Sequence, residues 1–402
     1  MPRSRTITPP WATLFGMGVA LLLPQTPVRA QSPDAAAGRH LMAQFQCNRC
    51  HEGTGLPAVP QEQHCVHCHT EILQGTFAVA PETLKTWQSH LVSLNAVPSL
   101  TAAASRLRRQ WIASFLLHPH DLRPGLPALM PRLDITPRQA QQIAAALVPR
   151  EAQGTPPAPG NPTSGRLLLD HLGCGACHQF TGVPPLRNTT AGPPIPPNQL
   201  RTAMALAPDL RYTRERFQPA ALIPWLRTPS QVKPDTQMPQ HPISESQAQD
   251  LAAYILTTPL SAQPTPVPPA RLPILSRRVS FDEVNERVFR RTCWHCHSTA
   301  AYAKGDGGPG NTGGFGFKGR GFSVTTYADV ASGVLDNQGN RRSVFAKVPD
   351  GTPRLLAVLL TRHKELAGEQ TPGLRGMPLG LPALSAEQIQ LVESWIAQGR
   401  PQ

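Results

Sequence analysis

The sequence predicts an all-α fold of three similar helical units joined by Pro-rich linkers. Residues 38–51, GRHLMAQFQCNRCH, align without gaps with residues 165–178, GRLLLDHLGCGACH. Further along, residues 130–147 align without gaps with residues 238–255, and residues 377–396 fit the same frame with two extra residues after the Met. Repetition of this kind indicates one supersecondary unit that is used several times.

Two Pro-rich segments separate the units. Residues 151–163 (EAQGTPPAPGNPT) and 259–273 (PLSAQPTPVPPARLP) are expected to be extended, semi-rigid spacers. They divide the chain into a first unit (31–150), a second unit (164–258) and a third unit (276–402), each predicted to be a domain. The length of 402 residues fits two or three domains of about 150 residues each.

Residues 1–30 have the features of a signal peptide. A basic start (MPRSR) precedes WATLFGMGVALLL, an apolar stretch of 13 residues, and the small residues Val28 and Ala30 follow. A membrane span needs about 20 residues, so this stretch is too short for a transmembrane helix. We expect cleavage after Ala30 and a periplasmic mature protein without a transmembrane segment. An uncleaved interfacial anchor is the alternative.

The charge favours acidic protein partners. The formal net charge is +13, and about +10 remains once the three Arg residues of the signal peptide are removed. A basic surface attracts acidic partners. The Lys and Arg residues are scattered and form no basic helix or stripe, so the pattern does not indicate nucleic-acid binding.

All eight cysteines lie in four C-x-x-C-H motifs, which is the attachment signature of c-type haem. Two thiols three residues apart can both bond to the porphyrin vinyl groups, and the His that follows can face the iron from the same side. The motifs therefore predict four covalently attached haems c, with the four His residues as axial iron ligands. In chain order, the motifs are CNRCH (Cys47, Cys50, His51), CVHCH (Cys65, Cys68, His69), CGACH (Cys174, Cys177, His178) and CWHCH (Cys293, Cys296, His297).

Three other uses of these cysteines compete with haem attachment. Disulfides are compatible with an oxidising compartment, but they do not require a His after every second Cys. Cys50 and Cys65 are separated by 14 residues, which is near the spacing of a four-cysteine zinc site. A thioredoxin-like redox pair would be accompanied by a βαβ pattern, and none is visible.

Each unit is expected to close with a Met-Pro loop and an amphipathic helix. Thr136, Ser244 and Ser385 are the expected N-caps of these helices. Strand content should be negligible, with at most one short ribbon near Val324 or Val344.

With these motifs and loops, each unit resembles a class I cytochrome c domain, and the resemblance covers nearly the whole chain after residue 30. It implies that the Met of each Met-Pro loop is the sixth iron ligand. The implied pairs are Met130 with His51, Met238 with His178, and Met377 with His297. The mature chain has five Met residues, and these three are the ones followed by Pro. Pro98-Ser99-Leu100 and Pro208-Asp209-Leu210 resemble the family's segment that lines the haem near its propionates.

The second motif has no Met-Pro partner, because four motifs face three such loops. It lies inside the first unit and is predicted to be an inserted second haem site. His90 is the favoured sixth ligand and His40 the next. An open iron is the alternative, and the other candidates are His64, His67, His118 and His120.

The predicted function is single-electron transfer between redox proteins by a periplasmic tetrahaem cytochrome, rather than catalysis. One alternative is a peroxidase-like enzyme that uses the haem of the second motif as an open site. The other is the cytochrome subunit of a respiratory or dehydrogenase complex, which the three-domain layout resembles. Such subunits have three haems, whereas this chain has four motifs, so the resemblance is incomplete.

Overall fold

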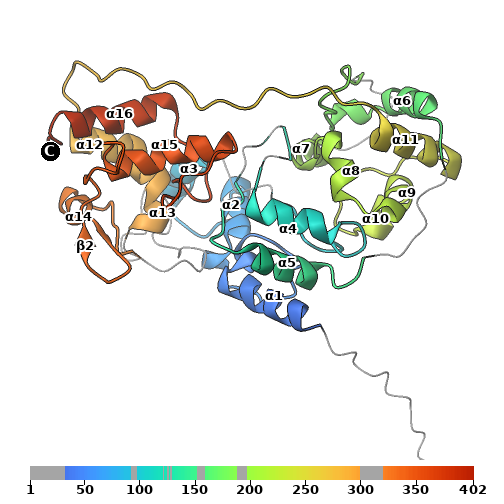
Figure 1. The fold of residues 1–402 in the computed structure, drawn as a ribbon, viewed down its shortest axis with the longest axis horizontal. Helices are drawn as coiled ribbons and strands as arrows, with labels where there is room; N and C mark the ends of the chain where they lie inside the picture. Colours follow the sequence, from blue (N-terminus) through green and yellow to red (C-terminus); the bar gives the residue numbers. More distant parts are fainter. Residues whose placement is uncertain are drawn as a thin grey trace, which may run out of the picture. The chain divides into compact units, whose positions relative to one another are not determined.

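The structure is a computed structural model that describes residues 32–91, 97–120, 122–124, 126, 129–151, 159–187, 197–298 and 320–402. Within these ranges the side chains of residues 62, 90, 197–199 and 295 are not described. The predicted signal peptide lies outside the described residues. Helices dominate, and the strands that are described form one two-stranded antiparallel ribbon, which confirms the all-α class (Figure 1).

The first unit contains α1 (Pro33–Gln44), η1 (Cys47–Arg49), η2 (Gln61–Gln63), α2 (Cys65–Gln74), α3 (Pro81–His90), α4 (Arg109–Leu117) and α5 (Pro137–Leu147). The second contains α6 (Pro162–His171), η3 (Cys174–Ala176), α7 (Pro197–Leu206), η4 (Leu210–Tyr212), α8 (Thr213–Arg216), α9 (Pro219–Arg227), α10 (Pro229–Val232) and α11 (Glu245–Thr257). The third contains α12 (Phe281–Val284), the π-helix η5 (Asn285–Cys293), α13 (Trp294–His297), α14 (Tyr327–Ser332), β1 (Val334–Leu335), β2 (Arg341–Arg342), α15 (Arg354–Leu366) and α16 (Ala386–Ala397).

The three closing helices α5, α11 and α16 begin as the sequence predicts. Thr136, Ser244 and Ser385 are their N-caps, and each side chain accepts a hydrogen bond from the backbone N–H of a Gln three residues on. That Gln side chain in turn accepts from the N–H of the cap residue. Each helix therefore starts with a complete capping box, which satisfies two backbone donors that would otherwise lack partners.

The first linker ends earlier than predicted. We expected a spacer over residues 151–163, but α6 already begins at Pro162 because Asn161 caps it by accepting from the N–H groups of Thr163 and Ser164. Pro is favoured at this first helical position. Residues 259–273 contain no helix or strand, in agreement with the predicted spacer (Figure 1).

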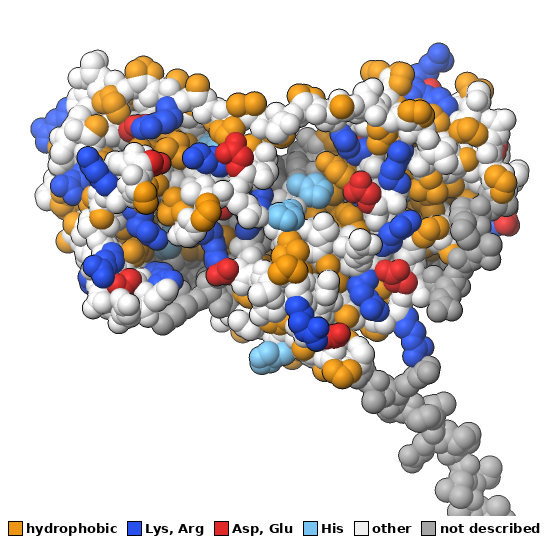
Figure 2. All heavy atoms as spheres, in the orientation of Figure 1, with side chains coloured by type: hydrophobic (Ala, Val, Ile, Leu, Met, Phe, Trp, Pro, Cys, Tyr) orange, Lys and Arg blue, Asp and Glu red, His pale blue; other side chains and the backbone are white. Residues whose placement is uncertain are grey.

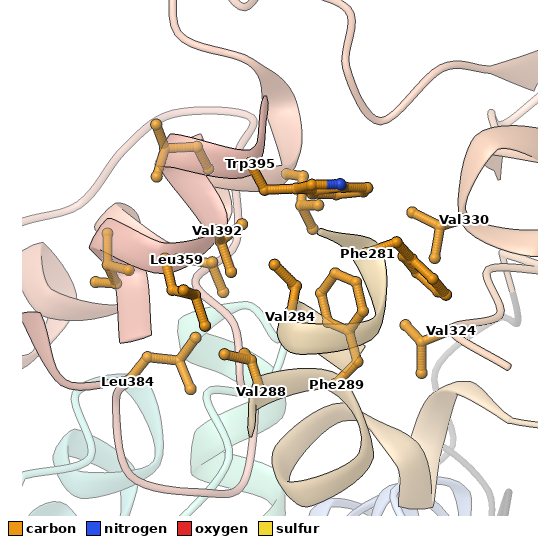
Figure 3. Close-up of a cluster of buried hydrophobic side chains, with 14 of the residues drawn as sticks. Phe281, Val284, Val288, Phe289, Val324, Val330, Leu359, Leu384, Val392 and Trp395 are labelled. Atoms are coloured by element: carbon orange, nitrogen blue, oxygen red, sulfur yellow. The ribbon is translucent and has the colours of Figure 1, made fainter. Parts of the chain in front are cut away.

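Buried apolar side chains gather in four separate clusters. Each unit has one large cluster, and a fourth, smaller one joins α2 to α3 through Cys68, Ile72 and Trp87. The third unit has the most aromatic core, in which Trp395 is fully buried beside Phe281 (Figure 3). The chain is poor in aromatic residues, and the clusters of the first two units are built mainly from Ala, Leu and Ile.

The first and last helices of the first two units cross at very close range. α1 packs on α5 and α6 packs on α11 (Figure 1). The contact points are Gly38 and Gly165, both nine residues before the first Cys of their motif. A Cβ atom at Gly38 would overlap the Gln142 carbonyl, and one at Gly165 would overlap that of Asp250. Only Gly allows these backbones to approach so closely.

We predict that Gly38→Ala destabilises the protein by about 1–3 kcal/mol, the usual cost of overpacking. The higher helix propensity of Ala offsets at most about 1 kcal/mol of this cost. Urea denaturation followed by circular dichroism measures the change. Ala36→Leu, which adds more volume at an exposed position of the same helix, should be near neutral. Equal stability of Gly38→Ala and the wild type would contradict the close crossing.

Candidate haem-attachment sites

The first and third motifs share one local backbone. After α1 the chain turns through Gln46 with a φ of 53°, and after α6 it turns through Gly173 with a φ of 70°. One 3-10 turn follows, and the backbone N–H of the motif His then donates to the carbonyl of the first Cys, at 3.0 Å for His51 and 2.9 Å for His178. Both thiols and the imidazole of each motif are thus carried by one compact turn.

The imidazole of each of these His residues is oriented by a carbonyl from the middle of its unit. His51 Nδ1 lies 2.8 Å from the Pro98 carbonyl, and His178 Nδ1 lies 2.8 Å from the Pro208 carbonyl. Because a carbonyl only accepts, Nδ1 is the protonated nitrogen and Nε2 is left with its lone pair. Burial lowers the pKa of both imidazoles and favours the neutral form, which is the form that binds a metal.

The sequence predicts this carbonyl segment in the first two units but not in the third, where the structure also contains it. The His297 side chain hydrogen-bonds to the backbone of Phe322, and the Val324 N–H donates to the His297 carbonyl at 2.7 Å. In Phe322-Ser323-Val324-Thr325, Ser323 Oγ accepts from the Thr325 N–H, as Ser99 Oγ does from the Thr101 N–H. Residues 98–101 (PSLT) and 322–325 (FSVT) are similar in sequence, but Phe322 stands where the first unit has Pro98. A pattern that requires Pro therefore does not include the third unit.

The three Met residues of the Met-Pro loops lie against the same cores as the motifs with which they are paired. Each Met is partly buried and packs on the large cluster of its unit, as does the first Cys of the motif. The pairs are Met130 with Cys47, Met238 with Cys174, and Met377 with Cys293. Met42 is a buried core residue, and Met204 is 49% exposed. Iron ligation by the three Met residues stays a prediction.

A buried carboxylate that no sequence motif predicts supports the Met-Pro loop of the third unit. Glu365 accepts from the backbone N–H of Gly376, next to Met377, at 2.8 Å. Its other oxygen lies 3.5 Å from Arg132 Nε and 3.6 Å from Arg362 Nη1. Arg132 directly follows Met130-Pro131, so one carboxylate joins the loops of the first and third units.

The second motif is built differently. Cys65 is the first residue of α2, so the whole CVHCH sequence lies in a regular helix without a preceding left-handed residue. α2 and α3 pack through their own small cluster, and the Gln88 side chain donates to the Ile72 carbonyl at 2.8 Å. No Met contributes to this cluster among the described residues. The structure thus shows a helical hairpin inserted between the two halves of the first unit.

The fourth motif departs from the first and third as well. Its first Cys, Cys293, is the last residue of a π-helix over residues 285–293. The rest of the motif, Trp294 to His297, forms α13. Position 284, nine residues before the first Cys, is a fully buried Val rather than Gly. The entry into this motif is therefore a continuous helical segment, which the repeat in the first two units did not predict.

The described side chains do not supply an evident sixth ligand for the second motif. His40, His67, His118 and His120 are exposed. His64 is buried, but its Nδ1 accepts from the His67 N–H and its Nε2 lies 3.3 Å from Glu52. The side chain of His90, the favoured candidate, lies outside the described residues. Its role stays a prediction.

Glu52, His64 and His67 form a compact group whose ligand atoms lie within 4.8 Å of one another. The two imidazoles stack with ring centroids 3.7 Å apart. A metal bound at His64 Nε2 would need the lone pair of that nitrogen, yet Nδ1 already uses its own lone pair to accept from a backbone N–H. Neutral imidazole cannot offer both lone pairs. We therefore interpret this group as the N-cap of α2, braced by Glu52, and not as a metal centre.

The geometry does not support a zinc site at the first two motifs. All eight cysteines are described and none is disulfide-bonded. The thiols of Cys50 and Cys65 hydrogen-bond to each other, which lowers the pKa of Cys65 to about 7. Burial raises the pKa of Cys47 and Cys68 to about 11. Among the described side chains, no cysteine joins a three-ligand cluster.

Residues 163–259 match the family model described as Cytochrome c. This match covers about a quarter of the chain and includes α6, the third motif, Met238 and α11. It supports a cytochrome c with covalently bound haem c and a role in electron transfer. No curated protein and no solved structure matches the chain.

We predict that Asp209→Ala loosens the carbonyl segment behind His178. Asp209 is buried, and its Oδ1 accepts from the N–H groups of Thr181 and Arg211 at 3.0 and 2.9 Å. Leaving these donors without a partner should lower the free energy of unfolding by about 1–3 kcal/mol. Asp209→Asn keeps the accepting oxygen and should restore most of the loss, as measured by urea denaturation. An equal loss in both variants would contradict this role.

Proposed function

We propose that the chain is a periplasmic c-type cytochrome with four covalently attached haems, which carries single electrons between protein partners. The observation that carries the proposal is the arrangement found at three of the four motifs. In each, the His is held by a backbone carbonyl, and the first Cys lies on the same buried cluster as a Met-Pro methionine.

The residues present fit haem c. Each motif offers two thiols for thioether bonds, and in the first and third motifs the Nε2 lone pair of the His is left for the iron. Bound haem would supply a one-electron ferric–ferrous couple. The Nδ1 hydrogen bond orients the imidazole and strengthens it as a donor. A Met thioether in the sixth position would keep substrates from the iron and raise the potential by favouring the ferrous state.

The surface fits brief encounters with acidic redox partners. Lys and Arg side chains are dispersed over the face shown in Figure 2, with fewer Asp and Glu among them. Among the described helices, none is both long and apolar enough to cross a membrane. Scattered basic charge favours fast, salt-sensitive association. Export by the signal peptide would place these encounters in the periplasm.

The second motif supports a second candidate function. Its small cluster lacks a Met among the described residues, so its iron could be open on one side. An open haem could reduce peroxide or a small oxyanion, and the protein would then be a haem enzyme. A stable catalytic partner that co-purifies would instead favour a cytochrome subunit of a dehydrogenase complex.

We predict that Met130→Ala, Met238→Ala and Met377→Ala each remove one of three His/Met spectroscopic signatures. The haem count should stay the same, because the thioether bonds do not involve Met. Absorption and paramagnetic NMR spectra provide the readout. Met204→Ala, at an exposed Met without a following Pro, is the matched control and should change nothing. An unchanged spectrum in any of the three variants would refute that ligand assignment.

We also predict that carbon monoxide does not bind rapidly to the reduced protein, because all four irons carry two protein ligands. The absorption spectrum after mixing measures the number of haems that bind. Rapid binding to one haem per chain would favour the enzyme. If the wild type does not bind and His90 is the sixth ligand, His90→Ala should create one haem that binds carbon monoxide. His40→Ala serves as its comparison.

A further inference from the structure

The Met-Pro loop of the first unit contacts the third unit through a shielded ion pair. Arg132 lies two residues after Met130, and its Nε is 3.5 Å from a carboxylate oxygen of Glu365 in α15. Arg132 Nη2 also donates to the backbone carbonyl of Glu365. Only 15% of the Arg132 side chain and 9% of the Glu365 side chain are exposed. The pair is therefore largely closed to water, unlike most ion pairs on protein surfaces.

A second ion pair joins the same two loops in the opposite sense. Arg375 lies two residues before Met377, and its Nη2 is 3.1 Å from Asp134 Oδ2 in the first unit. The Asp134 side chain is 86% exposed, so this pair contributes little to the free energy of folding. Together with Arg132 it connects the loops at two points, which restricts how one loop can turn against the other.

One face of α15 holds the loop of Met377. Val358, Arg362 and Glu365 are four and three residues apart, so they lie on the same side of the helix. The Met377 N–H donates to the Val358 carbonyl at 2.9 Å, and the Gly376 N–H donates to the Glu365 carboxylate at 2.8 Å. A carboxylate in the last turn of a helix is disfavoured by the helix dipole. Local helix stability therefore does not explain Glu365, whereas its tertiary contacts do.

Gly376 allows this carboxylate to approach the loop. A Cβ atom at Gly376 would lie 2.6 Å from Arg362 Cα and 2.7 Å from a carboxylate oxygen of Glu365. The residues that precede the Met in the other two Met-Pro loops are Leu129 and Gln237. A side chain thus stands in those loops where the third unit has the space for the carboxylate.

The Met-Pro loop of the second unit lacks the residues that make these contacts. In the gap-free alignment of the first two units, Gln240 stands in the place of Arg132, and Pro242 stands in the place of Asp134. Neither Gln nor Pro can form an ion pair. The third unit is thus matched to the loop of the first unit, although the second unit directly precedes it in the sequence.

A buried ion pair of this kind fixes geometry more than it adds stability. Arg362 is buried, and its Nη1 lies 3.6 Å from the same oxygen of Glu365 that Arg132 approaches. The cost of removing these charges from water is offset by their mutual attraction only when the geometry is right. Any other arrangement of the two loops would leave a buried charge without its partner. The cluster therefore favours one relative position of the loops.

We propose that Glu365 is a positioning residue for two Met ligands at once, Met377 in its own unit and Met130 in the first unit. The inference rests on the proposed function, in which these two Met residues are sixth ligands. Glu365 holds the loop of Met377 through Gly376 and the loop of Met130 through Arg132. Loss of the shared contact should therefore loosen both Met ligands, including the ligand that belongs to the other unit.

Displacement of Met by added imidazole in the oxidised holoprotein tests the proposal. Imidazole takes the sixth position more readily where the Met is held less firmly, and paramagnetic NMR reports each axial Met separately. Met130→Ala and Met377→Ala assign the two signals. We expect Arg132→Gln to raise the apparent affinity for imidazole in the third unit, and Glu365→Gln to raise it in the first unit. Each increase should be about tenfold, which corresponds to the loss of one charged hydrogen bond.

Three controls separate this effect from general loosening of the fold. Arg132→Lys keeps the charge and should raise the affinity for imidazole less than Arg132→Gln does. Arg138→Gln removes an exposed ion pair with Asp34 that lies within the first unit, so it should change neither affinity. The Met238 signal should stay constant in every variant, because its loop takes no part in the contact. An equal change at Met238 would overturn the proposal.

Mass spectrometry first gives the haem content of each variant. If the wild type lacks haem at the first or fourth motif, or if Met130→Ala and Met377→Ala leave the spectrum unchanged, the ligand assignment of the proposed function fails. If both signals are assigned, but Arg132→Gln affects only the first unit and Glu365→Gln only the third, this inference alone is overturned. Should Glu365→Gln fail to fold, the effect of Arg132→Gln on the third unit decides the outcome.

Discussion

The hydrogen bond from a motif histidine to a distant backbone carbonyl is the interaction on which the sites depend. It joins His51 to Pro98 and His178 to Pro208, across 47 and 30 residues of sequence. It fixes which ring nitrogen carries the proton and which is left for a metal. It also connects the start of each unit to its middle, so that the local turn of the motif becomes part of a tertiary fold.

The remaining features of each unit serve this geometry. Gly38 and Gly165 let the first helix approach the closing helix closely enough to set the position of the motif turn. The capping boxes fix where the closing helices begin, and the Met-Pro loops lie directly before them. Buried carboxylates then hold individual segments: Asp209 organises the turn behind His178, and Glu365 supports the loop of Met377.

Local signals in the sequence predicted much of this fold. The all-α class and the three helix caps are confirmed, because caps and periodicity depend on residues within a few positions of one another. The Phe322 segment was missed because its role depends on a backbone carbonyl, which side-chain identity specifies only weakly. The π-helix before the fourth motif and the helical setting of the second could not be predicted from motifs that share one spacing.

Long-range features could not be predicted from the sequence for a different reason. Arg106 stacks on Trp225 and Arg216 stacks on Trp111, which joins residues more than 100 positions apart, and no repeat pattern pairs them. His90, the favoured sixth ligand of the second motif, has a side chain that is not described, so this assignment stays a prediction. The domain boundaries and the number of haems likewise stay predictions, since the family match covers the second unit alone.

The central claim is that every one of the four motifs carries a covalently bound haem. Intact-mass spectrometry of the exported protein, combined with a pyridine haemochrome assay, tests it directly. The account predicts a mature chain that begins at Gln31 and is heavier by four haems, with four haems per chain by absorbance. A mass equal to that of the bare polypeptide, or three haems with free thiols at Cys65 and Cys68, would contradict it.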